Sequence, residues 1–446
     1  MRIAQLARRV SGHPRVPVVS RPRIDGRPSG GLIQYDGMTR PAARLPFNAV
    51  RPPHRSVFMR VAMLSSESLH SISSGGLGVH VTELAAGLQR RGHDMHVITR
   101  RKHDQSHYDC IDGVHYHRVD HGLSENYVEC MDYMCKAMAH RFHEVTSMIG
   151  RFELVHAHDW LSANAMKYVM DGYGTPGVLT MHSTEYGRDG NVFFDGFAAW
   201  VRDAEAAGCH NASVVIAVSR FLADELRRIY QVPDEKIHIV PNGVSYHAFD
   251  GYIDPAAVKG RYGIAPIAPM IFTPGRMTLQ KGMDMLVEAV PMVLASYPET
   301  RFVIAGEGPE RDTVIRRAHE VGAAGSIVFL ETVPRWQYID LMRACDIVAV
   351  PSRNEPFGIV VLEAWAAGKP VVATLAGGPR EFIWHDVNGY LVNTDPGGLA
   401  HGIGSLLADH DHCRALGGNG RRAVEDRFNW DNIASYTEGV YHMAAH

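Results

Sequence analysis

The feature that most constrains the fold is an alternation of short apolar segments with longer amphipathic segments, which runs from residue 57 to the C-terminus. The short segments have the length of buried strands, and the longer ones have the periodicity of helices. Strands that alternate with helices predict a parallel sheet with helices on both faces. We therefore expect an α/β protein of the doubly wound kind.

The alternation occurs as two series. The first contains the expected strands Val57–Leu64, Asp94–Thr99, Val155–His158, Gly177–Met181, Val214–Val218 and Ile237–Val240. The second contains Met270–Pro274, Arg301–Ala305, Ser326–Leu330, Asp346–Val350 and Pro370–Ala373. Between them, residues 243–269 are rich in Gly and Pro, which is typical of a linker. A chain of 446 residues also suits two domains of about 200 residues each better than one.

The first 55 residues differ from the rest of the chain. They are rich in Arg and Pro, poor in acidic residues and without periodicity, so we expect a disordered extension. An Arg-rich, acid-poor segment also weakly resembles a transit peptide. We prefer a simpler interpretation, in which Met59, at the start of the first expected strand, is the natural first residue.

Composition excludes several classes of protein. The formal net charge of −3 provides no basic field for nucleic acid. The sequence contains no apolar run near the ~20 residues that span a bilayer. The six cysteines are scattered and form no CxxC pair, which is typical of reduced thiols in a cytoplasmic protein. We expect a cytoplasmic globular protein with no nucleic-acid partner, and its oligomeric state stays open.

Two carboxylates, Glu355 and Glu363, follow an expected strand of the second series. Glu355 falls in the strand-to-helix loop, and Glu363 lies more than one turn into the helix. Unpaired N–H groups and the helix dipole stabilise an anion at such a helix start, here at the amides of Phe357, Gly358 and Ile359. The pattern predicts a pyrophosphate flanked by carboxylates that hold sugar hydroxyls. Alternatively, the two glutamates lie on a solvated face and form a helix ion pair, or they are the two catalytic carboxylates of a glycosidase.

A second loop of the same series supplies two cations. Thr273-Pro274-Gly275-Arg276 ends a strand, and Lys281-Gly282 opens the helix expected over Met283–Val290. Arg suits a forked contact with a diphosphate, and Lys supplies a point charge. Because both loops lie at strand ends of one sheet, we expect Arg276 and Lys281 to stabilise a leaving nucleoside diphosphate without a metal. Alternatively, Arg276 and Lys281 are ordinary surface cations beside a turn.

The first series has a glycine-rich loop, Gly75-Gly76-Leu77-Gly78, after its first strand. It is neither GxGxxG nor a P-loop, because no Lys-Ser/Thr pair follows it. Gly75 and Gly76 would let backbone amides approach a ligand oxyanion or sugar. A tight turn that packs the helix on the strand is an equal alternative.

Histidines follow two further strands of the first series. His182 comes directly after Gly177–Met181, where it could bond a sugar hydroxyl or fill a structural role. His156 and His158 occupy alternate positions of one strand and so share a face, which suggests a metal site. No third ligand stands at a recognisable spacing, so we expect no metal there.

These motifs together resemble the family 4 retaining glycosyltransferases with the GT-B fold. The resemblance covers roughly residues 57–446. It rests on the Gly75-Gly76 loop, the strand end at His182, Gly275-Arg276 with Lys281-Gly282, the Glu355/Glu363 pair, Val240-Pro241-Asn242-Gly243-Val244 and Phe428-Asn429-Trp430. It implies two Rossmann-like doubly wound domains that face a central cleft. Residues 56–250 with about 430–446 would form the acceptor-side domain and residues 268–429 the donor-binding domain, with the last helix, around Trp430–Tyr441, crossing back.

The resemblance also implies roles for single residues. The donor-binding residues would be Gly75, Gly76, Arg276, Lys281, Phe357, Gly358, Ile359 and Glu363. Of these, the two cations would hold the diphosphate and Glu363 the ribose. Glu355 and His182 would be the catalytic residues. Glu355 would hold the transferred sugar, and His182 would contact that sugar near its C6 hydroxyl and support the transition state through its backbone carbonyl.

The function implied is a metal-independent, retaining transfer of a hexosyl group from a nucleoside diphosphate sugar to a hydroxyl acceptor such as a glucan or another saccharide. The segment His182-Ser183-Thr184-Glu185-Tyr186-Gly187-Arg188 is similar to that of glucan-synthase-like members, which favours glucosyl. No cofactor is expected, and the base stays open. The alternatives are a nucleotide-sugar epimerase of the same fold, a non-catalytic sugar- or nucleotide-binding protein, and a glycosyltransferase with a lipid acceptor that contacts the membrane through helix 126–149.

Overall fold

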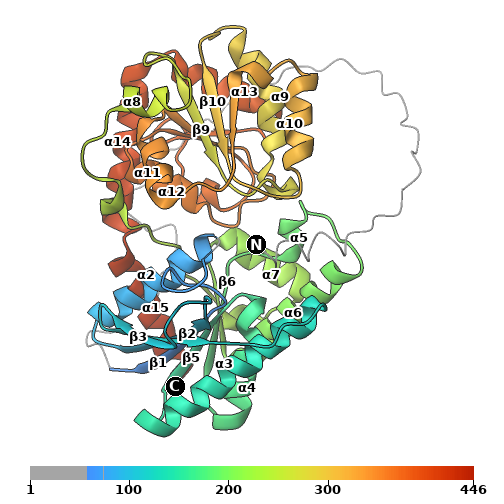
Figure 1. The fold of residues 1–446 in the computed structure, drawn as a ribbon, viewed down its shortest axis with the longest axis vertical. Coiled ribbons are helices and arrows are strands. Elements are labelled where there is room, and N and C mark those ends of the chain that lie inside the picture. The colour runs from blue at the N-terminus through green and yellow to red at the C-terminus, as the bar shows by residue number, and fades with distance from the viewer. Residues whose placement is uncertain (1–57, 74, 446) are drawn as a thin grey trace.

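The computed structural model describes residues 58–73 and 75–445, which form two α/β lobes stacked along the long axis of the molecule (Figure 1). Each lobe contains one largely parallel sheet covered by helices on both faces. This confirms the predicted fold of two doubly wound domains. The extension expected over residues 1–55 lies outside the described residues.

The N-terminal sheet has β1 near its centre, paired in parallel with β2 and β5. Within the described residues its spatial order is β3 (Tyr108–Ile111), β4 (Val114–Val119), β2 (Asp94–Arg100), β1 (Arg60–Leu64), β5 (Leu154–His158), β6 (Gly177–Met181), β7 (Val214–Ala217) and β8 (Ile237–Ile239). The β3–β4 hairpin was not predicted. Strand β4 carries His115, His117 and Arg118, so it lacks the apolar run by which the other strands were recognised.

The C-terminal sheet is parallel throughout the part of the chain that the structure describes. Its order is β11 (Ile327–Leu330), β10 (Arg301–Ala305), β9 (Met270–Pro274), β12 (Ile347–Val350), β13 (Val371–Thr374) and β14 (Tyr390–Val392). The first five match the predicted strands within one residue, and the three-residue β14 was missed. Because β9 and β12 are neighbours, the loops that follow them emerge side by side at the carboxyl edge of the sheet.

Helices cover both faces of each sheet. On the N-terminal sheet, one face packs on α2 (Gly76–Arg90) and α15 (Trp430–Ala445), and the other on α3 (Tyr127–Ile149), α4 (Trp160–Tyr173), α6 (Phe197–Asn211) and α7 (Arg220–Tyr230). On the C-terminal sheet, one face packs on α9 (Met283–Leu294), α10 (Arg311–Glu320) and α13 (Pro396–Leu407), and the other on α8 (Pro255–Gly260), α11 (Arg335–Ala344), α12 (Ile359–Ala366) and α14 (His410–Arg427). The one-turn helix α5 (Glu185–Arg188) lies where the lobes approach each other.

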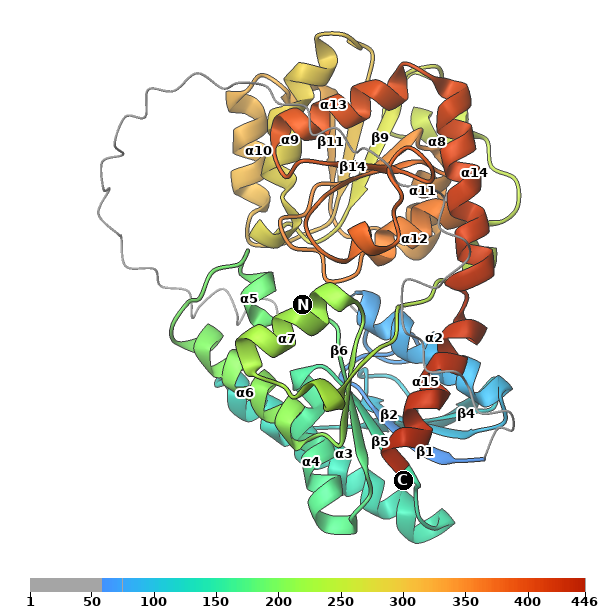
Figure 2. The same cartoon turned by 180° about the vertical axis from the view of Figure 1, so that it is seen from behind.

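The last two helices connect the lobes, as Figure 2 shows. Helix α14 packs against α12 in the C-terminal lobe, and α15 packs against α2 in the N-terminal lobe. The side chains of Ile433, Ala434 and Tyr441 are fully buried in the N-terminal core. This confirms that the last helix crosses back.

Helix α3, for which a membrane contact was considered, turns its apolar side inward. Met134, Met138 and Phe142 are fully buried in the core that includes α4. The structure therefore supports the alternative of a half-buried surface helix. Among the described residues, no helix is both long and apolar enough to cross a membrane.

Candidate active site

The centre of the candidate site is an ion pair between the two predicted loops of the C-terminal sheet. Lys281 Nζ lies 2.7 Å from Glu355 Oε2, and the Ser352 hydroxyl donates to the same oxygen at 2.9 Å. The Glu355 side chain is 9% exposed, whereas that of Lys281 is 22% exposed, so the ammonium faces the more open side of the pair. The structure thus brings together a cation and a carboxylate that stand 74 residues apart in the sequence.

Two glycines fix the loops that carry this pair. Gly282 has φ of +64°, and a Cβ there would lie 2.1 Å from the carbonyl oxygen of Pro351. Gly377 has φ of +116°, and a Cβ there would lie 2.1 Å from the carbonyl oxygen of Glu355. A side chain is excluded at both positions by conformation and by space. The loop that carries Glu355 is therefore closely packed at Pro351 and again at Glu355.

The start of helix α12 lies beside Glu355 and faces the other lobe. Gly358 is its N-cap residue, and no side chain of the described residues caps the helix. A Cβ placed on Gly76, the first residue of α2, would lie 3.3 Å from Ile359 Cδ1. Within the same described ranges, helix α2 also begins without a side-chain cap, after Gly75. Two uncapped helix starts thus meet between the lobes, an arrangement that suits an anion.

Glu363 is bound on both of its oxygens. Arg335 Nη1 donates to Oε1 at 2.7 Å, and the Tyr338 hydroxyl donates to Oε2. The Arg335 guanidinium in turn lies over the rings of Phe249 and Tyr338. Glu355 and Glu363 therefore have separate cationic partners, Lys281 and Arg335.

Arg276 lies two residues after the end of β9, and it is exposed. It lies within electrostatic reach of Glu355 in its own lobe and of Glu67, Asp159 and Arg188 in the N-terminal lobe. Its guanidinium is thus set between the lobes, near the Lys281–Glu355 pair, as expected for a group that meets a ligand there.

His182 is held in the N-terminal lobe directly after β6. Its backbone N–H donates to Asp159 Oδ1 at 2.8 Å, and its Nε2 lies 3.3 Å from His158 Nδ1. Burial lowers the pKa of His182 to about 4 and raises the pKa of Asp159 to about 6. Asp159 has φ of +56°, which is uncommon outside glycine and frequent at functional sites. The imidazole is accordingly neutral at physiological pH.

Contacts between the lobes hold the residues on both sides of Glu355. Asn354 Nδ2 donates to Glu225 Oε1 and to Asn191 Oδ1, both at 2.7 Å, and the Ser219 hydroxyl donates to the Pro356 carbonyl. Glu381, from the C-terminal lobe, accepts the first N–H groups of α7 at 3.0 and 2.7 Å. The position of the Glu355 loop is therefore coupled to the position of the N-terminal lobe.

The structure gathers most of the predicted residues between the lobes. Those brought together are Gly75, Gly76, Arg276, Lys281, Glu355, Phe357, Gly358 and Ile359. His182 is linked to them through Asp159, which binds its N–H and lies within electrostatic reach of Arg276. Glu363 lies one turn further along α12, with Arg335. Sequence reasoning missed Arg335, Tyr338, Asp159, Asn354 and Glu225. Two of these residues had a local signal in the sequence, because Asp159 is a polar residue directly after β5 and Asn354 precedes Glu355. Glu225 on α7, and Arg335 and Tyr338 on α11, are recognisable only from tertiary contacts.

Two clusters of side chains could hold a metal ion in the part of the chain that the structure describes. One contains His80, His158 and His182, and the other Asp94, His96 and His115. Sequence spacing offered no third ligand beside His156 and His158, whereas the fold brings further imidazoles to His158 from α2 and from the end of β6. The shared face of His156 and His158 is confirmed by rings 4.2 Å apart.

Comparison with known families identifies both lobes. Residues 74–247 match the family described as Glycosyltransferase Family 4, and residues 258–423 match Glycosyl transferases group 1. The first match covers most of the N-terminal lobe and the second most of the C-terminal lobe, so the site described above lies between the two matched regions.

Relatives match over nearly the full described length. A D-inositol 3-phosphate glycosyltransferase of Xylanimonas cellulosilytica is 33% identical over 86% of this chain and 97% of its own. A glycogen synthase of Mycobacterium tuberculosis is 28% identical over 86% of this chain and 94% of its own. The solved structure of a sucrose-phosphate synthase from Thermosynechococcus elongatus shares the fold, with a TM-score of 0.73 and 23% identity over 86% of this chain and 98% of its own.

Proposed function

The chain belongs to glycosyltransferase family 4, and from this premise we propose that it transfers a hexosyl group, with glucosyl preferred, from a nucleoside diphosphate sugar to a hydroxyl acceptor. We propose further that the transfer retains the anomeric configuration and needs no metal. The observation that carries the proposal is the Lys281–Glu355 pair beside the uncapped start of α12.

Lys281, Arg276 and the helix start are suited to the leaving group. A nucleoside diphosphate gains negative charge as the glycosidic bond breaks, and preorganised cations and N–H groups aimed at that charge lower the barrier. Lys281 can share its charge between Glu355 and a phosphate, because an ammonium has three donors. This set of charges supports departure of the diphosphate without a metal.

Glu355 and His182 would hold the transferred sugar from opposite lobes. A buried carboxylate and a neutral imidazole both suit sugar hydroxyls, since the carboxylate accepts and the imidazole can accept or donate. In the transfer that we propose, the departing phosphate takes the acceptor's proton on the face that it leaves, so configuration is retained. Glu355, bound to Lys281 and Ser352, is then a binding group and no covalent nucleophile.

Relatives guide the choice of sugar and acceptor. The relationship to a glycogen synthase supports a glucosyl donor and a glucan acceptor, in line with the residues that follow His182. The relationship to a D-inositol 3-phosphate glycosyltransferase supports a phosphorylated cyclitol acceptor as the next choice. The acceptor would bind to the N-terminal lobe. Of the earlier alternatives, the lipid acceptor loses its main support because the apolar face of α3 is buried.

A panel of donors and acceptors tests the proposal. The purified protein is incubated with UDP-, ADP- and GDP-hexoses, alone and with maltooligosaccharides or inositol phosphate, in the presence of a chelator. Release of nucleoside diphosphate that depends on an acceptor, with a glycoside product whose anomeric configuration matches that of the donor, is the expected result. Release of an isomerised sugar without an acceptor would identify an epimerase, and binding without turnover would identify a binding protein.

A further inference from the structure

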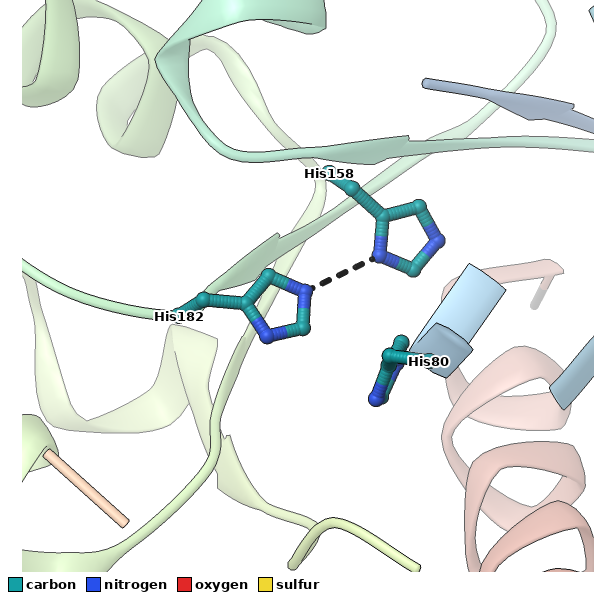
Figure 3. Close-up of side chains that lie close together, drawn as sticks. All are labelled: His80, His158 and His182. Carbon is teal, nitrogen blue, oxygen red and sulfur yellow. Dashed lines mark hydrogen bonds between the residues drawn. The ribbon is translucent and has the colours of Figure 1, made fainter. Parts of the chain in front are cut away.

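The N-terminal lobe contains a cluster of three imidazoles that the proposed transfer does not fully use. His80 comes from α2, His158 from the end of β5 and His182 from the residue after β6, and their rings converge (Figure 3). The His80 and His182 ring centroids are 4.5 Å apart, and those of His80 and His158 are 5.3 Å apart. Each residue offers one ring nitrogen, and these atoms all lie within 4.8 Å of one another.

Two members of this cluster carry polar atoms without partners. His80 is 3% exposed and His158 is fully buried. Among the described residues, neither ring nitrogen of His80 has a hydrogen-bond partner, and neither does Nε2 of His158, although Asn242 lies close to the His80 ring. A buried polar group without a partner has lost its hydration without compensation, which destabilises the fold. Such groups in a native fold call for an explanation, and for the His80 nitrogens an ion is one. His158 faces His182 with Nδ1, so its Nε2 takes no part in the cluster.

The spacing matches a known coordination geometry. In a tetrahedral zinc site with Zn–N bonds of about 2.0–2.1 Å, two ligand nitrogens lie about 3.3–3.4 Å apart. His158 Nδ1 and His182 Nε2 are 3.3 Å apart and share one hydrogen bond, which an ion would replace (Figure 3). The His80 nitrogen lies within 4.8 Å of the other two, so the His80 ring would have to move to reach the same separation. No hydrogen bond to the described part of the chain opposes that movement. Three histidines with a fourth, open position are a common ligand set for zinc.

We propose that His80, His158 and His182 bind a divalent transition-metal ion of the zinc class, with the fourth position open toward the region between the lobes. His182 is half-buried, so the open position lies on its side of the cluster. Binding of the ion occupies the imidazole that would otherwise contact the donor sugar. The ion therefore inhibits transfer, a consequence that rests on the proposed function, whereas its binding does not.

The second histidine cluster is less suited to an ion and provides the control. His96 uses both ring nitrogens, one at 3.0 Å from His117 and one at 3.0 Å from Asp94. Asp94 is also paired with Arg60 at 2.7 Å. Binding a metal there would break several of these bonds. His115→Ala removes a potential ligand of this cluster without touching the first.

Binding is tested on the full chain without an affinity tag of histidines. Chelator-treated protein is titrated with ZnCl₂ by calorimetry and with CoCl₂ by absorption, which reports tetrahedral coordination. We expect one tight site in the wild type and in His115→Ala. His80→Ala and His158→Ala should bind at least about 100-fold more weakly, since even outer-shell changes cost 10–100-fold. Absence of a tight site, or its loss in His115→Ala alone, would overturn the proposal.

The consequence for activity is tested separately, as the ratio of transfer rates with and without zinc. Zinc should lower the rate of the wild type and of His115→Ala but not that of His80→Ala, whatever the basal rate of each. If the wild type transfers sugar and zinc binds yet leaves the rate unchanged, the ion does not engage His182. If no transfer is found with any donor, the proposed function fails while the binding result stands.

Discussion

Asn354, the residue before Glu355, donates from its side-chain amide to Glu225 Oε1 on α7 of the other lobe at 2.7 Å. Both residues are buried, and Glu225 also accepts from the Thr184 hydroxyl. The bond therefore links the loop of the proposed catalytic carboxylate to the segment that follows His182. The two halves of the site are positioned relative to each other by this contact.

Breaking this contact should lower both stability and transfer. Asn354→Ala leaves a buried carboxylate short of one donor, and a hydrogen bond to a charged group contributes about 1.5–3 kcal/mol. We expect roughly a tenfold or greater fall in kcat/KM for the donor. A double-mutant cycle with Glu225→Gln should give a coupling of at least about 1 kcal/mol, measured by urea unfolding. Additive effects would show that the bond does not join the lobes energetically.

Glu363→Gln tests the proposed ribose contact through the donor itself. A carboxylate that accepts from ribose hydroxyls makes the wild type prefer a ribonucleotide sugar to its deoxyribose analogue, because one lost hydrogen bond to a charged group costs about 1.5–3 kcal/mol. The Glu363→Gln variant should lose most of that preference, with an increase in donor KM larger than the change in kcat. Tyr338→Phe, which removes one donor to Glu363, serves as the comparison. An unchanged preference would place the ribose elsewhere.

Asp159 is predicted to be a positioning residue for His182. Asp159→Ala removes the acceptor of the His182 backbone N–H, so kcat should fall about tenfold or more while donor KM changes little. Asp159→Asn keeps a side-chain oxygen and tolerates the positive φ, so it should restore most of the rate. A purely structural role would instead lower stability in both variants without separating kcat from KM.

Buried neutral histidines should make the protein less stable in mild acid. His156 is fully buried, with bonds to Tyr441 and Thr180, and burial lowers its pKa well below 6.5. Below about pH 6.5 the unfolded chain binds a proton that the folded chain does not, so the free energy of unfolding falls as pH falls. His156→Gln should reduce this slope by about 1 kcal/mol per pH unit between about pH 5 and 6.

The measurement is a series of urea unfolding curves across this range. His140→Gln on the exposed side of α3 is the matched control for the loss of an imidazole. The slope is the diagnostic quantity, because either variant can shift the absolute stability. Equal slopes for His156→Gln and the wild type would contradict the prediction.

What the sequence predicted well is local in the chain. The strand before Glu355 follows from an apolar run, and the structure has it within one residue. The helix start expected at the amides of Phe357, Gly358 and Ile359 is found at Ile359. The alternation of strands with helices predicted both sheets. Because parallel strands end at one edge, it also predicted that the loops of Lys281 and Glu355 would meet.

What it missed depends on contacts between distant segments or on polar strands. Arg335 reaches Glu363 only because α11 packs beside α12. Glu225 contacts Asn354 only because the two lobes are in contact. The third and fourth histidines near His156 and His158 come from other elements, so strand spacing could not reveal them. Strand β4 was not predicted because its histidines interrupt the apolar pattern, although its partner strand β2 was predicted.

The most direct test of the account concerns the Lys281–Glu355 pair. Transfer from the preferred donor is measured for Lys281→Ala and Glu355→Ala, each shown to be folded by circular dichroism, beside the surface control Arg317→Ala. We predict that both variants lose at least about 100-fold in kcat/KM, the scale for removing one preorganised charge contact, and that the control does not. Near wild-type transfer by either folded variant with every donor tested would contradict the assignment of this pair as the donor site.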